Sequence, residues 1–189
     1  MRDHLLVIGM MGAGKTTIGR QVARAMRRPF HDSDEEILRR TGHTVPEIFA
    51  TRGEAAFRAE ERAVLATALA SPVPSVIAVA GGAVFDPDSR RRIRRGGVTV
   101  WLRARPSTLA GRVGAGRGRP LLEHDPRGTL ARLDAMRRPV YQSLADVVVD
   151  VDGVVPSLVV DRVRQRASCW LAERDLERTV ARQVSCGSR

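Results

Sequence analysis

Residues 9–16 read Gly-Met-Met-Gly-Ala-Gly-Lys-Thr and match G-x-x-x-x-G-K-[ST], a pattern whose chemistry is the binding of phosphate groups. Glycines let the backbone wrap closely, so successive N–H groups point at phosphate oxygens, and the N-terminus of the next helix adds partial positive charge. In such a loop Lys15 reaches the β- and γ-phosphates, and the Thr16 hydroxyl ligates Mg²⁺. The alternative is a glycine turn without a ligand. We predict a nucleoside triphosphate site formed by Gly12, Ala13, Gly14, Lys15, Thr16 and Thr17.

Lys15 is the single lysine of the chain. Basic residues number 32 against 21 acidic ones, for a formal charge of +11, and 31 of the basic residues are arginines. A lysine kept at this one place indicates a position that fits a compact point charge and not a planar fork. The arginine excess itself is a compositional habit, and aromatic residues make up only 4%, which leaves few platforms for stacking bases. A nucleic-acid-binding protein is the weaker alternative, and we expect no specific nucleic-acid partner.

Two carboxylates, Asp32 and Asp34, follow a predicted strand, at the edge of the sheet where α/β proteins collect their ligands. Side chains two residues apart on an extended segment point in similar directions. One carboxylate can then approach a metal ion while the other meets an acceptor hydroxyl. The alternative is a helix N-cap, because Asp is favoured there and a helical pattern begins near Glu35. The two roles are compatible, and we predict a catalytic site here.

Three further candidates each have a structural alternative. Residues 53–61 read Gly-Glu-Ala-Ala-Phe-Arg-Ala-Glu-Glu, and such a run is most often a solvated helix with i,i+4 ion pairs. Gly81 and Gly82 end a predicted strand, where bare backbone can approach a ligand or form a tight turn. Arg137 lies late in a helical segment and could equally be surface charge.

The elements that must position these residues alternate along the chain. Short apolar runs predict buried parallel strands at 4–9, 29–32, 75–80, 98–102 and 147–151. Helices are predicted at 15–26, from the capping box at 44–47, and at 54–70, 87–95, 106–112, 126–144 and 156–170. This alternation predicts an α/β fold: a three-layer P-loop kinase with a five-stranded parallel sheet, helices on both faces and a mobile lid. The glycine- and arginine-rich residues at about 112–124 are the predicted lid, with a floppy surface loop as the alternative.

Length and composition restrict the class further. With 189 residues, 43% of them apolar, the chain suits one domain, placed at 1–170, followed by a C-terminal tail at 171–189. There is no room for a motor and no guanine-reading N-K-x-D sequence, so a small kinase remains. No apolar run could cross a bilayer, and the start lacks the apolar stretch of a signal peptide. Two cysteines without metal-type spacing argue against zinc and a disulfide scaffold, so we expect a cytoplasmic protein with no membrane partner.

Taken in order, these motifs resemble the shikimate kinase family, whose members share the nucleoside-monophosphate-kinase-like P-loop fold. The resemblance covers about residues 4–166. Many families share the P-loop, and the combination of the other motifs is far more specific than any one of them. Those motifs are Asp32-x-Asp34, Gly53-Glu54-x-x-Phe57-Arg58, Gly81-Gly82-Ala83-Val84, Arg119-Pro120-Leu121-Leu122 and Arg137-x-Pro139-x-Tyr141.

The resemblance implies that the substrate is shikimate, phosphorylated by ATP at its 3-hydroxyl in a step toward chorismate and the aromatic amino acids. It implies that Asp34 binds the ring hydroxyls and acts as base or orienter for the attacking oxygen. Arg58 and Arg137 would hold the substrate carboxylate, since an arginine pair suits an anionic acid. Glu61 would fix Arg58 in place. The implied shikimate-binding set is Asp34, Arg58, Gly81, Gly82 and Arg137.

For the nucleotide half, the resemblance implies ATP and Mg²⁺ as cofactors. Asp32 would join Thr16 in the metal shell, and Arg119 would swing in on the lid toward the phosphates. Arg112 would lie against the adenine, and the loop at 150–156 would be the adenine loop, with Asp152 assigned to the nucleotide. The catalytic residues implied are Lys15, Asp34 and Arg119. Members of the family are commonly monomeric, and we expect a monomer.

One position departs from the family pattern. Three glycines are usual where this chain has Ala80-Gly81-Gly82. A methyl group at Ala80 is tolerable where φ is negative, and costs about 1 kcal/mol or more where φ must be positive. The effect on substrate affinity stays open from the sequence. The nearest alternative is a gluconate-type sugar-acid kinase, which would share the ATP half but is not expected to combine Arg58, the glycine pair and Arg137.

Overall fold

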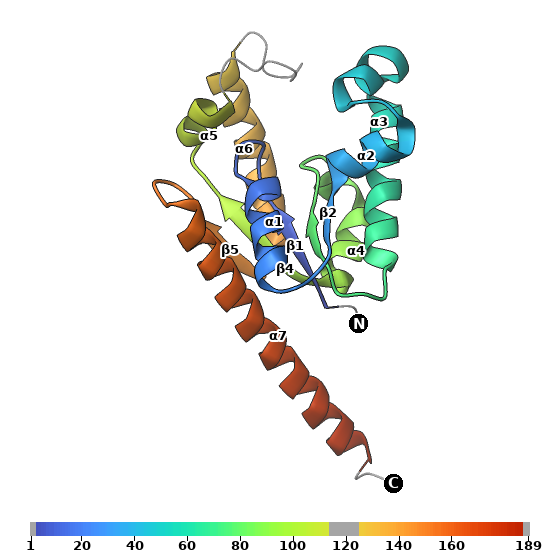
Figure 1. The fold of residues 1–189 in the computed structure, drawn as a ribbon, viewed down its shortest axis with the longest axis vertical. Coiled ribbons are helices and arrows are strands. Elements are labelled where there is room, and N and C mark those ends of the chain that lie inside the picture. The colour runs from blue at the N-terminus through green and yellow to red at the C-terminus, as the bar shows by residue number, and fades with distance from the viewer. Residues whose placement is uncertain (1–2, 114–124, 187–189) are drawn as a thin grey trace.

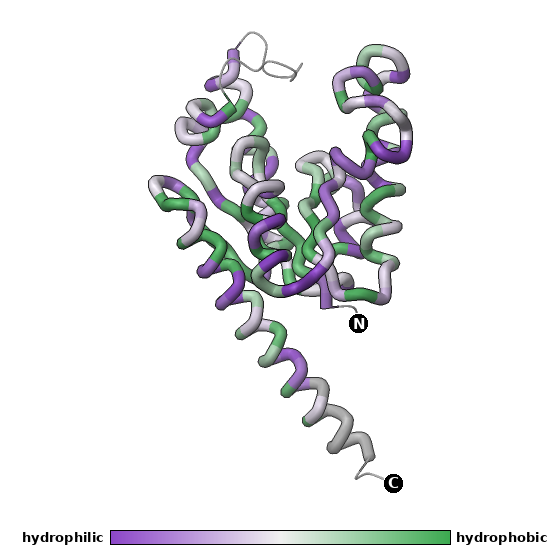
Figure 2. Tube along the Cα trace, viewed as in Figure 1, coloured by the Kyte–Doolittle hydropathy of each residue, from purple (hydrophilic) through white to green (hydrophobic). Residues whose placement is uncertain are grey.

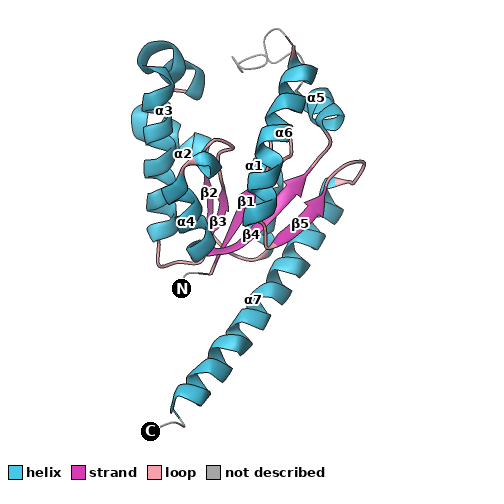
Figure 3. Ribbon diagram, turned by 180° about the vertical axis from the view of Figure 1, so that it is seen from behind, coloured by secondary structure: helices cyan, strands magenta, loops and turns pink. Residues whose placement is uncertain are grey.

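A computed structural model of the chain describes residues 3–113 and 125–186. Its centre is a five-stranded parallel sheet in the order β2-β3-β1-β4-β5 (Figures 1 and 3). The strands are β1 (His4–Ile8), β2 (Phe30–Asp32), β3 (Val76–Ala78), β4 (Gly97–Arg103) and β5 (Val147–Asp150). All four pairings are parallel, and β1 lies in the middle, with Leu5 opposite Val76 of β3 and Val98 of β4. The prediction of five parallel strands is confirmed.

The helices lie on both faces of this sheet. They are α1 (Lys15–Ala25), α2 (Ser33–Thr41), α3 (Val45–Ala70), α4 (Pro87–Gly96), α5 (Pro106–Val113), α6 (Pro126–Leu144) and α7 (Pro156–Cys186), with a 3₁₀ turn η1 at Ala83–Phe85. On one face α1 and α7 pack together, with α7 against β4 and β5. On the other face α4 and α6 contact β4, and α3 packs on α4. The chain moves along the sheet in one direction from β1 to β2 and in the other direction from β2 to β5. Because connections between parallel strands are right-handed, this reversal places α1 on one face of the sheet and the later connecting helices on the other.

The sheet is buried on both faces, which explains why its strands read as continuous apolar runs. Every residue of β1 and of β3 is buried, and apolar residues concentrate along the strands and the inward sides of the helices (Figure 2). A second, smaller cluster lies between α2 and α3 and comprises Ile37, Ile48, Phe57 and Val64. The unit formed by α2 and α3 therefore has its own apolar support.

The α3 helix contains the two helices that the sequence predicts. It begins at the predicted capping box, in which Thr44 and Glu47 exchange hydrogen bonds between side chain and backbone. Gly53 interrupts it with φ +75° and ψ 173°, a conformation that disfavours residues with a side chain. The prediction of a helix start near Glu54 is thereby confirmed, although the helical segments on either side of Gly53 form one kinked element.

The C-terminal helix is longer than predicted. The sequence predicts a helix at 156–170 followed by a tail at 171–189, whereas α7 continues to Cys186. Its second half extends away from the rest of the protein (Figures 1 and 3), and Leu176 and Val180 there are 67% and 51% exposed. No helix within the described residues is long and apolar enough to cross a membrane.

Candidate active site

The motif residues meet in one cavity of about 930 Å³ at the carboxyl ends of the strands. It is lined by the P-loop, the β2–α2 junction, the glycine pair after β3, and the arginines of α3 and α6. Twelve of the residues predicted for the nucleotide, metal and substrate lie in this lining: Gly12, Ala13, Gly14, Lys15, Thr16, Thr17, Asp32, Asp34, Arg58, Gly81, Gly82 and Arg137. Arg112 also lies in it, whereas Arg119 and most of the predicted lid fall outside the described residues.

The P-loop has the backbone that its sequence predicts. Gly12 and Gly14 have φ of +79° and +94°, which favours glycine at both positions. Gly14 is the N-cap of α1, and the first turn of that helix carries no acidic residue and no side-chain cap. This N-terminus is therefore suited to an anionic ligand. The Lys15 ammonium donates to the carbonyls of Gly9 and Met10 at 3.0 and 3.2 Å, so the loop curls closely around it.

Asp32 joins the first two helices at the nucleotide end. Its Oδ2 accepts a 2.6 Å hydrogen bond from the Thr16 hydroxyl, and its Oδ1 accepts from the backbone N–H of Asp34 at 3.0 Å, as the N-cap of α2. The predicted cap is therefore confirmed, and the same carboxylate lies beside Thr16, the residue predicted to ligate Mg²⁺. A hydroxyl and a carboxylate oxygen suit Mg²⁺, which commonly takes one or two protein oxygens and completes its shell with phosphate and water.

Arg58, which lines the same cavity, is held by two carboxylates of α3. Glu61 accepts from Nη1 at 2.5 Å and is only 2% exposed, whereas Glu54 accepts from Nη2 at 2.8 Å with its side chain 64% exposed. Burial raises the pKa of Glu61, and the hydrogen bond from Arg58 opposes that rise. The predicted fixing of Arg58 by Glu61 is therefore present, and so is the exposed i,i+4 pair that was its alternative.

Arg137 is also a cation of the cavity lining, but its surroundings differ from those of Arg58. It is 6% exposed, and none of its nitrogens lies within ion-pair distance of a carboxylate in the part of the chain that is described. Its Nη1 lies 4.0 Å from the Met10 sulfur, its Nε has no hydrogen-bond partner, and its guanidinium lies 5.7 Å from the ring centre of Phe85. Burying a charge without a partner is costly, so this position is suited to receive an anion.

The glycine pair lets both arginines approach the backbone. A Cβ on Gly82 would stand 1.7 Å from Nη1 of Arg58, and one on Gly81 would stand 2.9 Å from Nη1 of Arg137. Ala80 is different: among the described residues other than glycine, positive φ occurs only at Arg27, so the backbone at Ala80 accepts a methyl group. The departure at Ala80 therefore introduces no backbone strain.

Arg112 and the loop after β5 form the far wall of the nucleotide end. Nη2 of Arg112 donates to the Val151 carbonyl at 2.8 Å and Nη1 to the Gly12 carbonyl at 3.5 Å, which joins this loop to the P-loop. Val154 and Pro156 line the cavity beside it. A planar guanidinium and an apolar proline are suitable neighbours for a flat base.

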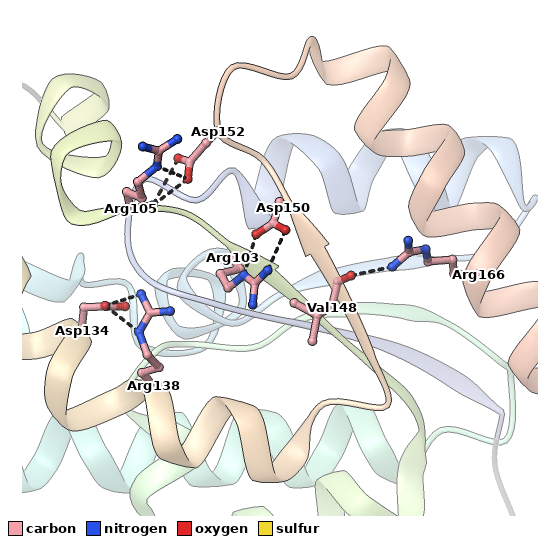
Figure 4. A network of polar contacts seen from close by, with 8 residues as sticks. All are labelled: Arg103, Arg105, Asp134, Arg138, Val148, Asp150, Asp152 and Arg166. Atoms are coloured by element: carbon pink, nitrogen blue, oxygen red, sulfur yellow. Dashed lines mark hydrogen bonds and ion pairs between the residues drawn. The ribbon is translucent and has the colours of Figure 1, made fainter.

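The structure does not bring Asp152 into the cavity lining. Its carboxylate accepts a hydrogen bond from the backbone N–H of Arg105 at 3.1 Å and forms an ion pair with the guanidinium of Arg105 at 3.3 Å (Figure 4). In the same network Asp150 accepts from Arg103 at 2.5 Å, and Arg138 pairs with Asp134 (Figure 4). Asp152 therefore ties the loop after β5 to the start of α5, which is a supporting contact and not a contact with the cavity.

Sequence reasoning missed part of the cavity's acceptor end. Phe49 and Phe57 line it from α3, with ring centres 4.8 Å apart. Ser33, the first residue of α2, is joined to the end of β3, because its hydroxyl donates to the Ala78 carbonyl and accepts from the backbone N–H of Ala80. The two phenylalanines are eight residues apart, a helical spacing that could have indicated a shared face had Gly53 not divided the pattern.

Fold and site together define a small P-loop kinase of the nucleoside-monophosphate-kinase type. The sequence model of the shikimate kinase family matches residues 11–168. Shikimate kinase from Pseudomonas syringae pv. tomato is 43% identical over 164 residues, which cover 86% of this chain and 95% of the relative. The relative from Thiobacillus denitrificans is 45% identical over 150 residues, 79% of this chain and 81% of its own. The chain belongs to the shikimate kinase family.

Solved structures agree with this assignment. Shikimate kinase from Acinetobacter baumannii in complex with shikimate superposes with a TM-score of 0.83 at 32% identity, covering 92% of this chain and 95% of that one. A gluconokinase from Sinorhizobium meliloti superposes with a TM-score of 0.58 at 21% identity, covering 94% and 99%. The second likeness is one of fold alone.

Proposed function

We propose that this protein transfers the γ-phosphoryl group of ATP to the 3-hydroxyl of shikimate, giving shikimate 3-phosphate and ADP. The observation that carries the proposal is Arg137, a buried guanidinium without a carboxylate partner among the described residues, which lines the cavity beside Gly81. An acceptor with its own carboxylate supplies the missing charge there and brings its ring hydroxyls into the cavity that the P-loop also lines. Family membership supports shikimate as that acceptor.

The chain's own residues then have distinct tasks. Arg58 and Arg137 bind the acceptor carboxylate, and Asp34 orients the attacking hydroxyl and accepts its proton. The oxygen forms a bond to the γ-phosphorus while the bond to the β–γ bridging oxygen breaks, and ADP leaves. Lys15 and the N-terminus of α1 stabilise the negative charge that spreads over the phosphoryl oxygens. Thr16 and Asp32 would hold Mg²⁺, which would supply further positive charge on the phosphates.

The roles proposed for Arg119 and for the predicted lid rest on the family resemblance alone. Closure of residues 112–124 would exclude water from the phosphoryl group and bring Arg119 to the phosphates. Replacement of Arg119 by Ala should then lower kcat more than it weakens shikimate binding. Equal kcat in the two proteins would count against this role.

We further propose that the protein acts as a monomer in the cytoplasm, with ATP, Mg²⁺ and shikimate as its ligands and without a nucleic-acid partner. The main alternative acceptor is a sugar acid such as gluconate. Light scattering of the purified protein tests the monomer, and salt-independent binding of DNA or RNA would contradict the last point.

ADP release by the purified protein tests the activity directly, with ATP, Mg²⁺ and shikimate, quinate or gluconate as acceptor. We expect turnover with shikimate and much less with the others. The variant Arg137→Ala should raise the shikimate KM by about 100-fold, since it removes one charged partner of a buried carboxylate. Arg138→Ala is the matched control, because that neighbouring side chain pairs with Asp134 and does not line the cavity. Preference for gluconate would refute the proposed substrate.

A further inference from the structure

Tyr141 follows Arg137 by one turn of α6, so both side chains leave the helix on the same face. Its side chain is fully buried, at 0% exposure, and its ring packs tilted against Trp101 with centroids 5.8 Å apart. Tyrosine has two side-chain torsions, and this packing fixes the ring within the core. The hydroxyl is therefore held in one place by the core of the protein.

The hydroxyl of Tyr141 lies where Arg137 meets the glycine pair. A Cβ on Gly81 would be 3.4 Å from the Tyr141 oxygen and 2.9 Å from Nη1 of Arg137, so both groups border the same small volume. Neither the Tyr141 hydroxyl nor Nε of Arg137 makes a hydrogen bond of normal geometry within the described residues, although the Arg137 guanidinium is near enough to the hydroxyl to lower its pKa. Buried polar atoms without partners are rare, and these two differ from others in the core because they border the volume beside the glycine pair, where a bound ligand can bring them into a hydrogen bond.

Burial keeps this hydroxyl neutral. Burial raises the pKa of Tyr141 to about 12, Arg137 opposes the rise, and Asp134 and Glu61 add to it. A neutral phenol can accept a hydrogen bond from a guanidinium and leave the positive charge uncancelled. Arg58, by contrast, shares its charge with Glu61. The two arginines of the site are thus supported in chemically different ways.

We propose that Tyr141 is a positioning residue for Arg137: its hydroxyl accepts a hydrogen bond from the guanidinium when the acceptor carboxylate binds, and fixes its direction without neutralising it. This inference rests on the proposed function, because it takes Arg137 as a ligand of the shikimate carboxylate. Tyr141 does not line the cavity and acts through Arg137.

The variant Tyr141→Phe keeps the ring and removes only the hydroxyl. We expect its Kd and KM for shikimate to rise about tenfold, the effect of losing one hydrogen bond to a charged group, with kcat and the KM for ATP within about twofold of wild type. The melting temperature should be nearly unchanged, because the hydroxyl contributes no hydrogen bond to the substrate-free fold. Thr99→Val is the matched control, since the Thr99 hydroxyl is also buried and unpartnered but lies in β4 away from the cavity. It should leave the shikimate KM unchanged.

A double-mutant cycle shows whether Tyr141 acts through Arg137. In the Arg137→Ala background, adding Tyr141→Phe should change shikimate binding, measured by calorimetry, less than twofold. Independent tenfold losses that multiply, or a Tyr141→Phe protein that binds shikimate like wild type, would overturn the inference. Absence of shikimate turnover in the wild-type protein would overturn the proposed function instead, so the two failures are distinguishable.

Discussion

The Thr16 hydroxyl donates a 2.6 Å hydrogen bond to Oδ2 of Asp32, and this contact joins the phosphate-binding turn of α1 to the end of β2. The other carboxylate oxygen of Asp32 caps α2, the helix that carries Asp34 toward the acceptor. One carboxylate therefore fixes the nucleotide end and the acceptor end of the cavity relative to each other. This arrangement allows its structural role and its proposed role beside Mg²⁺ to be separated by substitution.

Asp32→Asn retains a capping oxygen and loses the negative charge. Asn and Asp cap helices about equally well, so the free energy of unfolding should stay nearly constant. The Mg²⁺ concentration for half-maximal activity should rise about tenfold or more, because one anionic oxygen of the shell is lost. Asp32→Ala should show the same Mg²⁺ defect and, in addition, lower the unfolding free energy by about 1 kcal/mol. An unchanged Mg²⁺ requirement in Asp32→Asn would exclude Asp32 from the metal shell.

Lys15→Arg tests why the chain keeps its single lysine at this position. The ammonium donates to two loop carbonyls at 3.0 and 3.2 Å, and a wider guanidinium does not fit the same turn. We expect kcat to fall by about 100-fold or more, with little change in melting temperature. Arg20→Lys, on the exposed side of the same helix, is the control and should retain activity. Wild-type kcat in Lys15→Arg would show that charge alone suffices.

Glu61→Gln and Glu54→Gln compare two carboxylates that share Arg58 as partner and differ in burial. The buried Glu61 holds the guanidinium, so its amide variant should raise the shikimate KM about tenfold. The exposed Glu54 pair contributes little in water, and its variant should change the KM less than about twofold. Steady-state kinetics at several shikimate concentrations measure both. Equal effects in the two variants would show that burial does not decide which carboxylate positions Arg58.

The raised pKa of Glu61 also predicts a pH dependence. Its carboxylate loses its charge at a higher pH than an exposed glutamate, so the shikimate KM should increase earlier on acidification. The effect on stability has the opposite sign. The folded protein binds a proton at Glu61 more readily than the unfolded chain does, so Glu61 adds to the free energy of unfolding as the pH falls through its folded-state pKa. Glu61→Gln should flatten both dependences. Denaturant titrations and kinetics at matched pH values measure them.

Local sequence signals predicted most of this arrangement. Continuous apolar runs predicted the strands, because the strands of a sheet that is covered on both faces are apolar on both sides. Gly53 indicated the interruption in α3. The P-loop and its lysine were predictable because their chemistry depends on neighbours within eight residues. The capping role of Asp32 was predictable for the same reason, because the cap directly precedes the helix that it begins. Its hydrogen bond with Thr16 joins residues 16 apart in the sequence and depends on the assembled fold.

Contacts across the sheet were not predictable in the same way. Asp152 pairs with Arg105, 47 residues earlier, only because β4 and β5 lie side by side, and nothing local indicates that pairing. The unpartnered state of Arg137 and its approach to Gly81 likewise require the assembled fold. The length of α7 was underestimated because residues 172–177 and 179–180 are exposed or only partly buried, although residues 171–186 lack glycine and proline and contain good helix formers.

Gly82→Ala and Ala80→Gly test the one departure from the family pattern. A Cβ at Gly82 would collide with the Arg58 guanidinium at 1.7 Å, so we expect the shikimate KM to rise by more than about tenfold. Restoring glycine at Ala80 should leave the KM unchanged, since the backbone there already suits a methyl group. Its unfolding free energy should fall by about 0.5–1 kcal/mol through the greater freedom of the unfolded chain. A large gain in shikimate affinity in Ala80→Gly would show that the methyl group obstructs the site.

Truncation after Leu171 tests whether the kinase domain ends near residue 170. Trp170 and Leu171 still pack against the core, whereas Leu176 and Val180 are 67% and 51% exposed. Removing the chain beyond Leu171 should therefore leave kcat, both KM values and the melting temperature close to those of the full chain. Truncation after Asp161 is the contrasting control, because it removes the fully buried Val163 and Ala167 and should destabilise the fold by several kcal/mol. Loss of activity or stability in the shorter truncation would mean that the projecting half of α7 belongs to the functional unit.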